Sequence, residues 1–129
     1  MKKIALPILI MLSVIFLKAQ TIDVKKNIIS IDGQECLKLD KSDPNNVSIA
    51  DLNGNDLVYL KFNRDKYGAL YNTVIFLSTK QSFTSKRFIY TAKLLVKRMA
   101  EFHLLEDCKI NPAKLDNFIM KCDENVQLN

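Results

Sequence analysis

The side chains best suited to redox or nucleophilic chemistry in this sequence are three cysteines and a single histidine. A cysteine beside a histidine can act as a nucleophile activated by a base, but no Ser, Cys or Asp close to His103 in sequence forms a recognisable motif. A zinc site is not indicated either, because there is no C-x-x-C or H-x-H spacing. We therefore expect no catalytic residue, no metal and no cofactor. We interpret His103 as a structural residue near a helix C-terminus, where a cation is favoured.

The cysteines can also form a disulfide if the chain is exported to an oxidising compartment. Three cysteines allow three single pairings, and each leaves one cysteine over. The pairing that we single out joins Cys108 to Cys122, 14 positions further along, where loop closure would contribute about 3 kcal/mol. Cys36 alternates with Leu37 and Leu39, which predicts that it lies on the opposite face of its strand. The alternative is three small apolar residues with no bridge.

Side chains with oxygen atoms surround Gly54, and alternate oxygen ligands are typical of calcium loops; they are Asp51, Asn53, Asn55 and Asp56. An EF-hand loop needs glycine at its sixth position and glutamate at its twelfth. Counted from Asp51, the glycine is at the fourth position and Phe62 is at the twelfth. A hairpin turn explains the same residues, so we expect no calcium here.

The strongest charge feature is a basic segment between residues 80 and 103, where six cations face one acid, Glu101. Like charges on one face can bind an acidic partner or an anionic lipid surface. The alternative is the solvated outer face of an amphipathic helix. The candidate partner-binding residues are Lys86, Arg87, Lys93, Lys97 and Arg98.

The elements that must position these residues change in type along the chain. Over 22–78 the apolar residues alternate or cluster in short runs, which is typical of strands. Asp32-Gly33 and Asn53-Gly54 each separate two such runs and favour tight hairpin turns. Residues 71–77 are rich in β-branched and aromatic side chains and predict a further buried strand. We expect a meander of about five strands, or six if residues 22–25 also pair.

After Ser85 the period becomes helical. The apolar stripe consists of Phe88, Ala92, Leu95, Val96, Met99, Phe102 and His103. With Ser85 as an N-cap candidate, this stripe predicts a helix over 85–104. Asn111-Pro112 then indicates the start of a second helix over 112–123. Strands followed by helices predict an α+β fold, in which an N-terminal antiparallel β-meander is followed by two C-terminal helices packed on one face of the sheet. We expect one domain over 21–129.

The first twenty residues have the pattern of a secretory signal peptide. Lys2 and Lys3 are followed by Ile4 to Leu17, a largely apolar run of 14 residues. This run is shorter than the roughly 20 residues that span a bilayer. Cleavage after Ala19 or Gln20 would lower the net charge from +5 to +2. A retained N-terminal anchor is the alternative. A small net charge and export both argue against nucleic-acid binding.

The short apolar run and the Ala-Gln ending resemble signal peptides of Bacteroidota, and the remainder resembles small secreted proteins of that group. The resemblance implies export to the periplasm or the medium and implies no activity. We therefore expect a non-catalytic binding module of the bacterial envelope, without a transmembrane span in the mature chain, whose partner is a protein or an envelope component. The alternatives are an enzyme of unrecognised type, using His103 or a carboxylate such as Asp51, and a periplasmic immunity or inhibitor protein.

Overall fold

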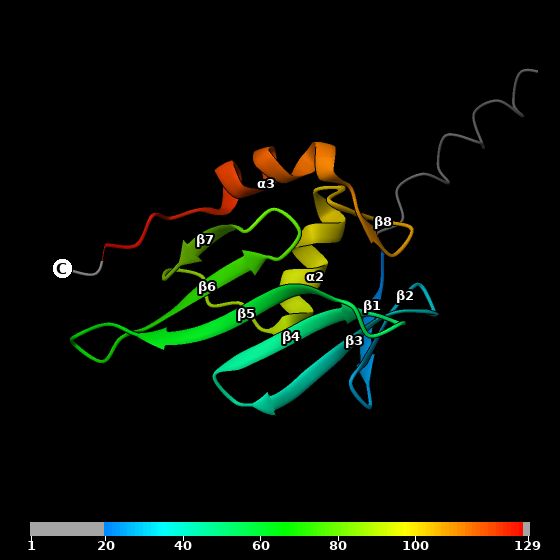
Figure 1. The fold of residues 1–129 in the computed structure, drawn as a ribbon, viewed down its shortest axis with the longest axis horizontal. Coiled ribbons are helices and arrows are strands. Elements are labelled where there is room, and N and C mark those ends of the chain that lie inside the picture. Colours follow the sequence, from blue (N-terminus) through cyan, green and yellow to red (C-terminus); the bar gives the residue numbers. More distant parts are fainter. Residues whose placement is uncertain (1–19, 128–129) are drawn as a thin grey trace, which may run out of the picture.

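A computed structural model describes residues 20–127, so the predicted signal peptide lies outside the described residues except for Gln20. Seven antiparallel strands form one sheet in sequence order, and two helices follow them (Figure 1). The α+β prediction is confirmed, but the sheet has seven strands rather than five or six. The strands are β1 (Ile22–Lys25), β2 (Ile28–Ile31), β3 (Gln34–Asp43), β4 (Asn46–Asp51), β5 (Asp56–Arg64), β6 (Leu70–Phe76) and β7 (Gln81–Ser85).

The Asp-Gly turn forms as its residue types predict. Asp32 and Gly33 both have positive φ values, +52° and +84°, which is the geometry that closes a two-residue hairpin. The turn between β4 and β5 is longer. Its Asp51 carboxylate accepts hydrogen bonds from the backbone N–H groups of Asn53 and Asn55, and only Gly54 has a positive φ there.

A β-bulge in β3 places Cys36 on the buried side of the sheet. Ile29 pairs with Leu37, but the next residue of β2, Ser30, pairs with Glu35, so Cys36 is an extra residue. An extra residue changes the alternation of side chains between the two faces. Cys36 and Leu37 are therefore both buried, and the prediction that they lie on opposite faces is wrong.

The first predicted helix is too long at both ends. The helix α2 (Ala92–Glu101) begins after Thr91, whose side-chain oxygen accepts a hydrogen bond from the Leu94 N–H. Ser85 is not its cap but the last residue of β7. A loop over 86–91 joins this edge strand to the helix.

The C-terminal end of α2 is closed by His103. This residue adopts a left-handed φ of +60°. Its N–H donates to the Ala100 carbonyl, and the Leu104 N–H donates to the Met99 carbonyl, which together form a Schellman motif. His103 and Phe102 therefore follow the helix and are exposed, although both were assigned to the apolar stripe of the predicted helix.

A short hairpin and a second helix complete the chain. The hairpin consists of β8 (Leu105–Glu106) and β9 (Lys109–Ile110), and the helical part consists of a 3-10 turn η2 (Pro112–Lys114) and α3 (Leu115–Cys122). The Asn111 side chain accepts a hydrogen bond from the Ala113 N–H at 3.1 Å. The second helix therefore begins at Pro112, as Asn111-Pro112 predicts, and ends at Cys122.

Both helices share one core with the sheet. The helix α2 lies near the edge strand β1, and α3 lies along the other edge strand, β7 (Figure 1). A cluster of rings joins β6, β7 and α3 at its centre, formed by Phe76, Phe83, Phe118 and Tyr90. The buried Asn72 ties the loop before α2 to the sheet, because its side chain accepts from the Tyr90 N–H and donates to the Lys61 carbonyl.

Candidate functional site

The five cations predicted as a partner site do not form one stripe. Lys86 and Arg87 precede α2, in the loop 86–91. The Lys86 ammonium lies 2.6 Å from the Asp65 carboxylate. The backbone N–H groups of Lys86 and Arg87 both donate to one oxygen of Glu124, at 2.9 and 2.8 Å. This part of the loop is thus fixed between the β5–β6 turn and the residues that follow α3.

The carboxylates that hold this loop are kept in their charged form. A hydrogen bond from the Lys86 ammonium holds the pKa of Asp65 below its usual value. Burial raises the pKa of Glu124, but hydrogen bonds from the N–H groups of Arg87 and Lys86 outweigh this effect and lower it. The Lys86 side chain therefore belongs to a structural contact of the fold, whereas Arg87 takes part in it through its backbone N–H.

Arg98 packs against aromatic rings. Its guanidinium carbon lies 4.8 Å from the ring centroid of Phe88, 5.7 Å from that of Tyr90 and 5.9 Å from that of Phe102. The Lys121 ammonium of α3 lies 5.1 Å from the Phe102 ring. These distances fall within the range of cation–π attraction, so the rings fix the guanidinium at the surface.

We call this set the arginine–aromatic surface, and it consists of Phe88, Leu94, Arg98, Phe102 and Lys121. Phe88, Leu94 and Phe102 are 38%, 39% and 37% exposed. Leu94 lies one helical turn before Arg98 on α2. Aromatic residues and arginine together are the composition of protein-interface hot spots.

Sequence reasoning identified Arg98 of this surface but neither Lys121 nor the apolar part. Phe88 and Phe102 were assigned to one apolar helical stripe, which predicts no exposed patch. The signal that points to the surface is the four-residue spacing of Leu94, Arg98 and Phe102, which places three side chains along one line of a helix.

Lys93 and Lys97 extend from the solvent side of α2. The opposite side of the helix carries Leu95, Val96 and Met99, which are buried. Neither lysine forms an ion pair with any residue in 20–127. They therefore add positive charge to the solvent-exposed side of α2.

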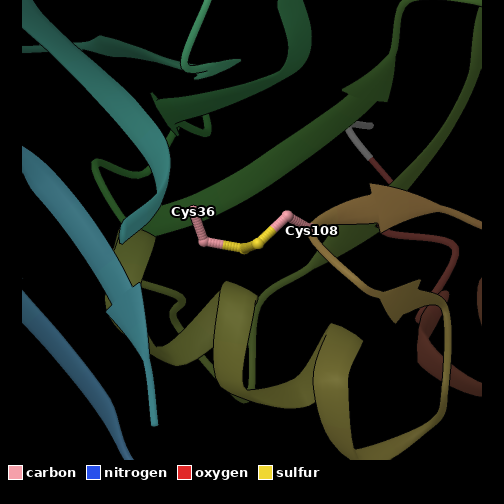
Figure 2. Close-up of a disulfide and its surroundings, with 2 residues drawn as sticks. All are labelled: Cys36 and Cys108. Atoms are coloured by element: carbon pink, nitrogen blue, oxygen red, sulfur yellow. A yellow bond between two sulfur atoms is a disulfide. The ribbon is translucent and has the colours of Figure 1, made fainter. Parts of the chain in front are cut away.

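The disulfide joins Cys36 to Cys108, with 5.2 Å between their Cα atoms (Figure 2). The prediction of a Cys108–Cys122 bridge is therefore wrong. The β3 bulge turns Cys36 inward, and the β8–β9 turn carries Cys108 to it, while Cys122 lies in the core as a free thiol. The bridge closes a separation of 72 residues. Loop-closure entropy for a loop of that length is about 4 kcal/mol.

No cysteine offers a reactive thiolate at neutral pH. Two are joined to each other. Burial raises the pKa of the Cys122 thiol, and burial also raises the pKa of the neighbouring Tyr90 to about 12. A buried thiol with a raised pKa is a poor nucleophile, so the Cys–His arrangement considered from the sequence has no support in the described part of the chain.

The oxygen-rich segment around Gly54 forms the turn between β4 and β5. Three hydrogen bonds from Asn53 and Asn55 reach the Asp51 carboxylate and lower its pKa, with the Asn55 backbone N–H as the main cause. Within residues 20–127, no group of three or more His, Cys, Asp or Glu side chains is arranged to hold a metal ion. No helix in the same range is long and apolar enough to cross a membrane.

The arginine–aromatic surface thus holds the Arg98 guanidinium beside exposed rings, with the Lys121 ammonium next to one of them. Compared with known protein families, with curated proteins and with solved structures, the chain has no match.

Proposed function

We propose that this chain is an exported, non-catalytic binding protein of the bacterial envelope that contacts an acidic protein through its arginine–aromatic surface. The observation that carries the proposal is the exposure of Phe88, Leu94 and Phe102 beside Arg98. Isolated exposed apolar residues are ordinary, whereas several grouped around a cation are a feature of interaction sites.

The cost of ordering this surface on binding is small. Side chains that become immobilised at an interface lose rotamer freedom, which opposes association. Arg98 already lies within 6 Å of three ring centroids, and a planar guanidinium stacked on rings retains its donors for a carboxylate. The surface is therefore prepared for a partner that presents a carboxylate among apolar groups.

The charges around the surface favour an acidic partner. Lys93, Lys97 and Lys121 are exposed, and Glu101 is the only acid within α2. Complementary charge speeds the encounter between two proteins and suppresses contact with partners of the same sign.

Export is supported by the disulfide, because such bridges persist in oxidising compartments. The Cys36–Cys108 bridge joins the sheet to the hairpin that precedes α3. We therefore place the protein in the periplasm or outside the cell, which agrees with the signal pattern of residues 1–20.

The proposal is tested by capture from an envelope extract of the producing cell, with residues 21–129 immobilised. The site variant is Arg98→Ala with Phe102→Ala. The control is Lys41→Ala with Tyr67→Ala, which also removes one exposed cation and one exposed ring but on other elements. We expect an acidic protein that wild type and control retain and that the site variant loses at least tenfold. Equal retention by both variants, or retention of no acidic protein, contradicts the proposal.

A further inference from the structure

A groove of about 670 Å³ opens beside the disulfide, where three hairpins meet. Its walls come from the β4–β5 turn, the β6–β7 turn and the β8–β9 hairpin. Its volume lies in the range of small-molecule sites, which is about 300–1,000 Å³. It lies outside the arginine–aromatic surface, because no residue of that surface lines it.

The lining of the groove is mainly apolar and comes from distant parts of the sequence. Leu115 is buried, Leu57, Leu77 and Ile110 are half-buried, and Leu52 is 41% exposed. The Cys36–Cys108 disulfide also lines the groove. Such a lining favours an apolar body over water.

Half of the six polar residues that line the groove are acidic. Asp51, Asp56 and Asp107 line it, and Lys109 is the single cation among its lining residues. The carboxylate of Asp51 accepts hydrogen bonds within its own turn, while Asp56 and Asp107 are exposed. The groove thus combines apolar walls with a net negative charge.

We propose that this groove binds a small amphiphilic amine, with its apolar body on the leucine and isoleucine side chains and its ammonium group beside Asp56 and Asp107. An amine satisfies both parts of the lining, because apolar burial supplies most of the affinity and the carboxylates select the charge. A neutral molecule of the same shape lacks the second contribution, and a carboxylate of the same shape is repelled.

The test compares three ligands that share one alkyl chain: decylamine, 1-decanol and decanoate, each below its aggregation limit at neutral pH. Titration calorimetry gives the affinity, and amide NMR shifts give the location. We expect decylamine to bind at least about tenfold more tightly than decanol, which corresponds to about 1.4 kcal/mol. Decanoate is expected to bind most weakly, and the largest shifts are expected at Leu57, Leu77 and Ile110.

The carboxylates are tested with Asp56→Asn and Asp107→Asn together. Asparagine tolerates the positive φ of +51° at position 107, so the turn is retained. The control is Asp23→Asn with Glu35→Gln, which removes two exposed carboxylates outside the groove. We expect the Asp56/Asp107 variant to bind decylamine about tenfold more weakly and decanol unchanged, and the control to behave as wild type.

The proposal is overturned if decanol binds as tightly as decylamine, if the control loses as much affinity as the groove variant, or if the shifts lie outside the groove. Groove shifts that depend on protein concentration alone would identify a second copy of the chain as the occupant and also overturn it. Because the groove and the arginine–aromatic surface share no residue, none of these outcomes bears on the acidic partner.

The disulfide provides a further arm of the test. The β8–β9 hairpin supplies Asp107 and Ile110 to the groove, and the bridge holds this hairpin against β3. Replacing Cys36 and Cys108 by alanine should therefore weaken decylamine binding at a temperature at which the chain remains folded. Unchanged affinity in the folded double variant contradicts this arrangement of the groove.

Discussion

At the scale of single residues, Phe118 shows how the helices are held to the sheet. Its ring centroid lies 6.1 Å from Phe76, 5.9 Å from Phe83 and 5.9 Å from Phe102. The contacts are edge-to-face, which is a favoured arrangement of aromatic pairs. The same side chain thus joins two strands to the residue that ends α2, and so supports the surface on which Arg98 rests.

Phe118→Ala should lower the free energy of unfolding by about 3–5 kcal/mol, because it leaves a cavity among rings. The matched control is Met120→Ala on the same helix, since Met120 is 78% exposed. Its effect should stay within about 0.5 kcal/mol. Urea unfolding of both variants measures the difference, and similar losses would contradict the assignment of the buried face of α3.

Glu124 determines how one contact responds to acid. Its folded pKa lies below the usual value of 4.5, so its stabilising contribution is present above that pH and is lost as the pH falls through the folded pKa. Glu124→Gln should therefore reduce stability at pH 7, and the difference from wild type should shrink as the pH falls below 4.5. Unfolding curves from pH 7 to pH 3 test this; a constant difference would show that ionisation of Glu124 is not involved.

At the scale of elements, sequence patterns predicted most of the strands and both helices. They failed where tertiary contacts determine whether a segment forms a strand or which residues pair. The Asp32-Gly33 turn and the start of the second helix at Pro112 formed as predicted, because turn and cap chemistry is local. The strand β7 (Gln81–Ser85) was missed since Phe83 is its only apolar residue, and its identity depends on pairing with β6. The local sequence pattern does not show which segments pair as neighbouring strands.

The disulfide failed as a prediction for a similar reason. Residue spacing indicated Cys108 and Cys122, but pairing depends on which cysteines the fold brings within reach. The β3 bulge turns Cys36 toward Cys108, and a bulge has no clear sequence signal here. Only one part of the arginine–aromatic surface can be recognised from the sequence. The charge of Arg98 is visible there, whereas the exposure of its neighbouring rings is not.

The pairing predicts a definite thiol count. Protein denatured without reductant should expose one thiol, that of Cys122, and reduced protein should expose three. Non-reducing digestion should yield one peptide pair, containing Cys36 and Cys108. Reduction should lower the free energy of unfolding by about 4 kcal/mol. A pair that contains Cys122 would contradict the structure.

At the scale of the whole molecule, the net charge is small, and positive charge is concentrated in particular segments. With residues 1–20 removed the net charge would be only +2, so the attraction that we propose for an acidic partner would come from local cations such as those of α2. Lys93, Lys97 and Arg98 supply three of them on a single helix of ten residues. One side of this helix is buried against the core, and its opposite side presents these cations to solvent.

The most direct test of this account measures the association rate of the captured acidic partner with Lys93→Glu plus Lys97→Glu. Both lysines are exposed, so the reversal should leave folding intact and slow association at least about tenfold at low salt. The matched control is Lys25→Glu plus Lys41→Glu, two exposed lysines of β1 and β3. The wild-type rate should itself fall as salt shortens the Debye length from about 30 Å at 0.01 M to about 10 Å at 0.1 M. Our account predicts a slow variant, a normal control and this salt dependence; an association rate that the α2 reversal leaves unchanged at both salt concentrations would contradict it.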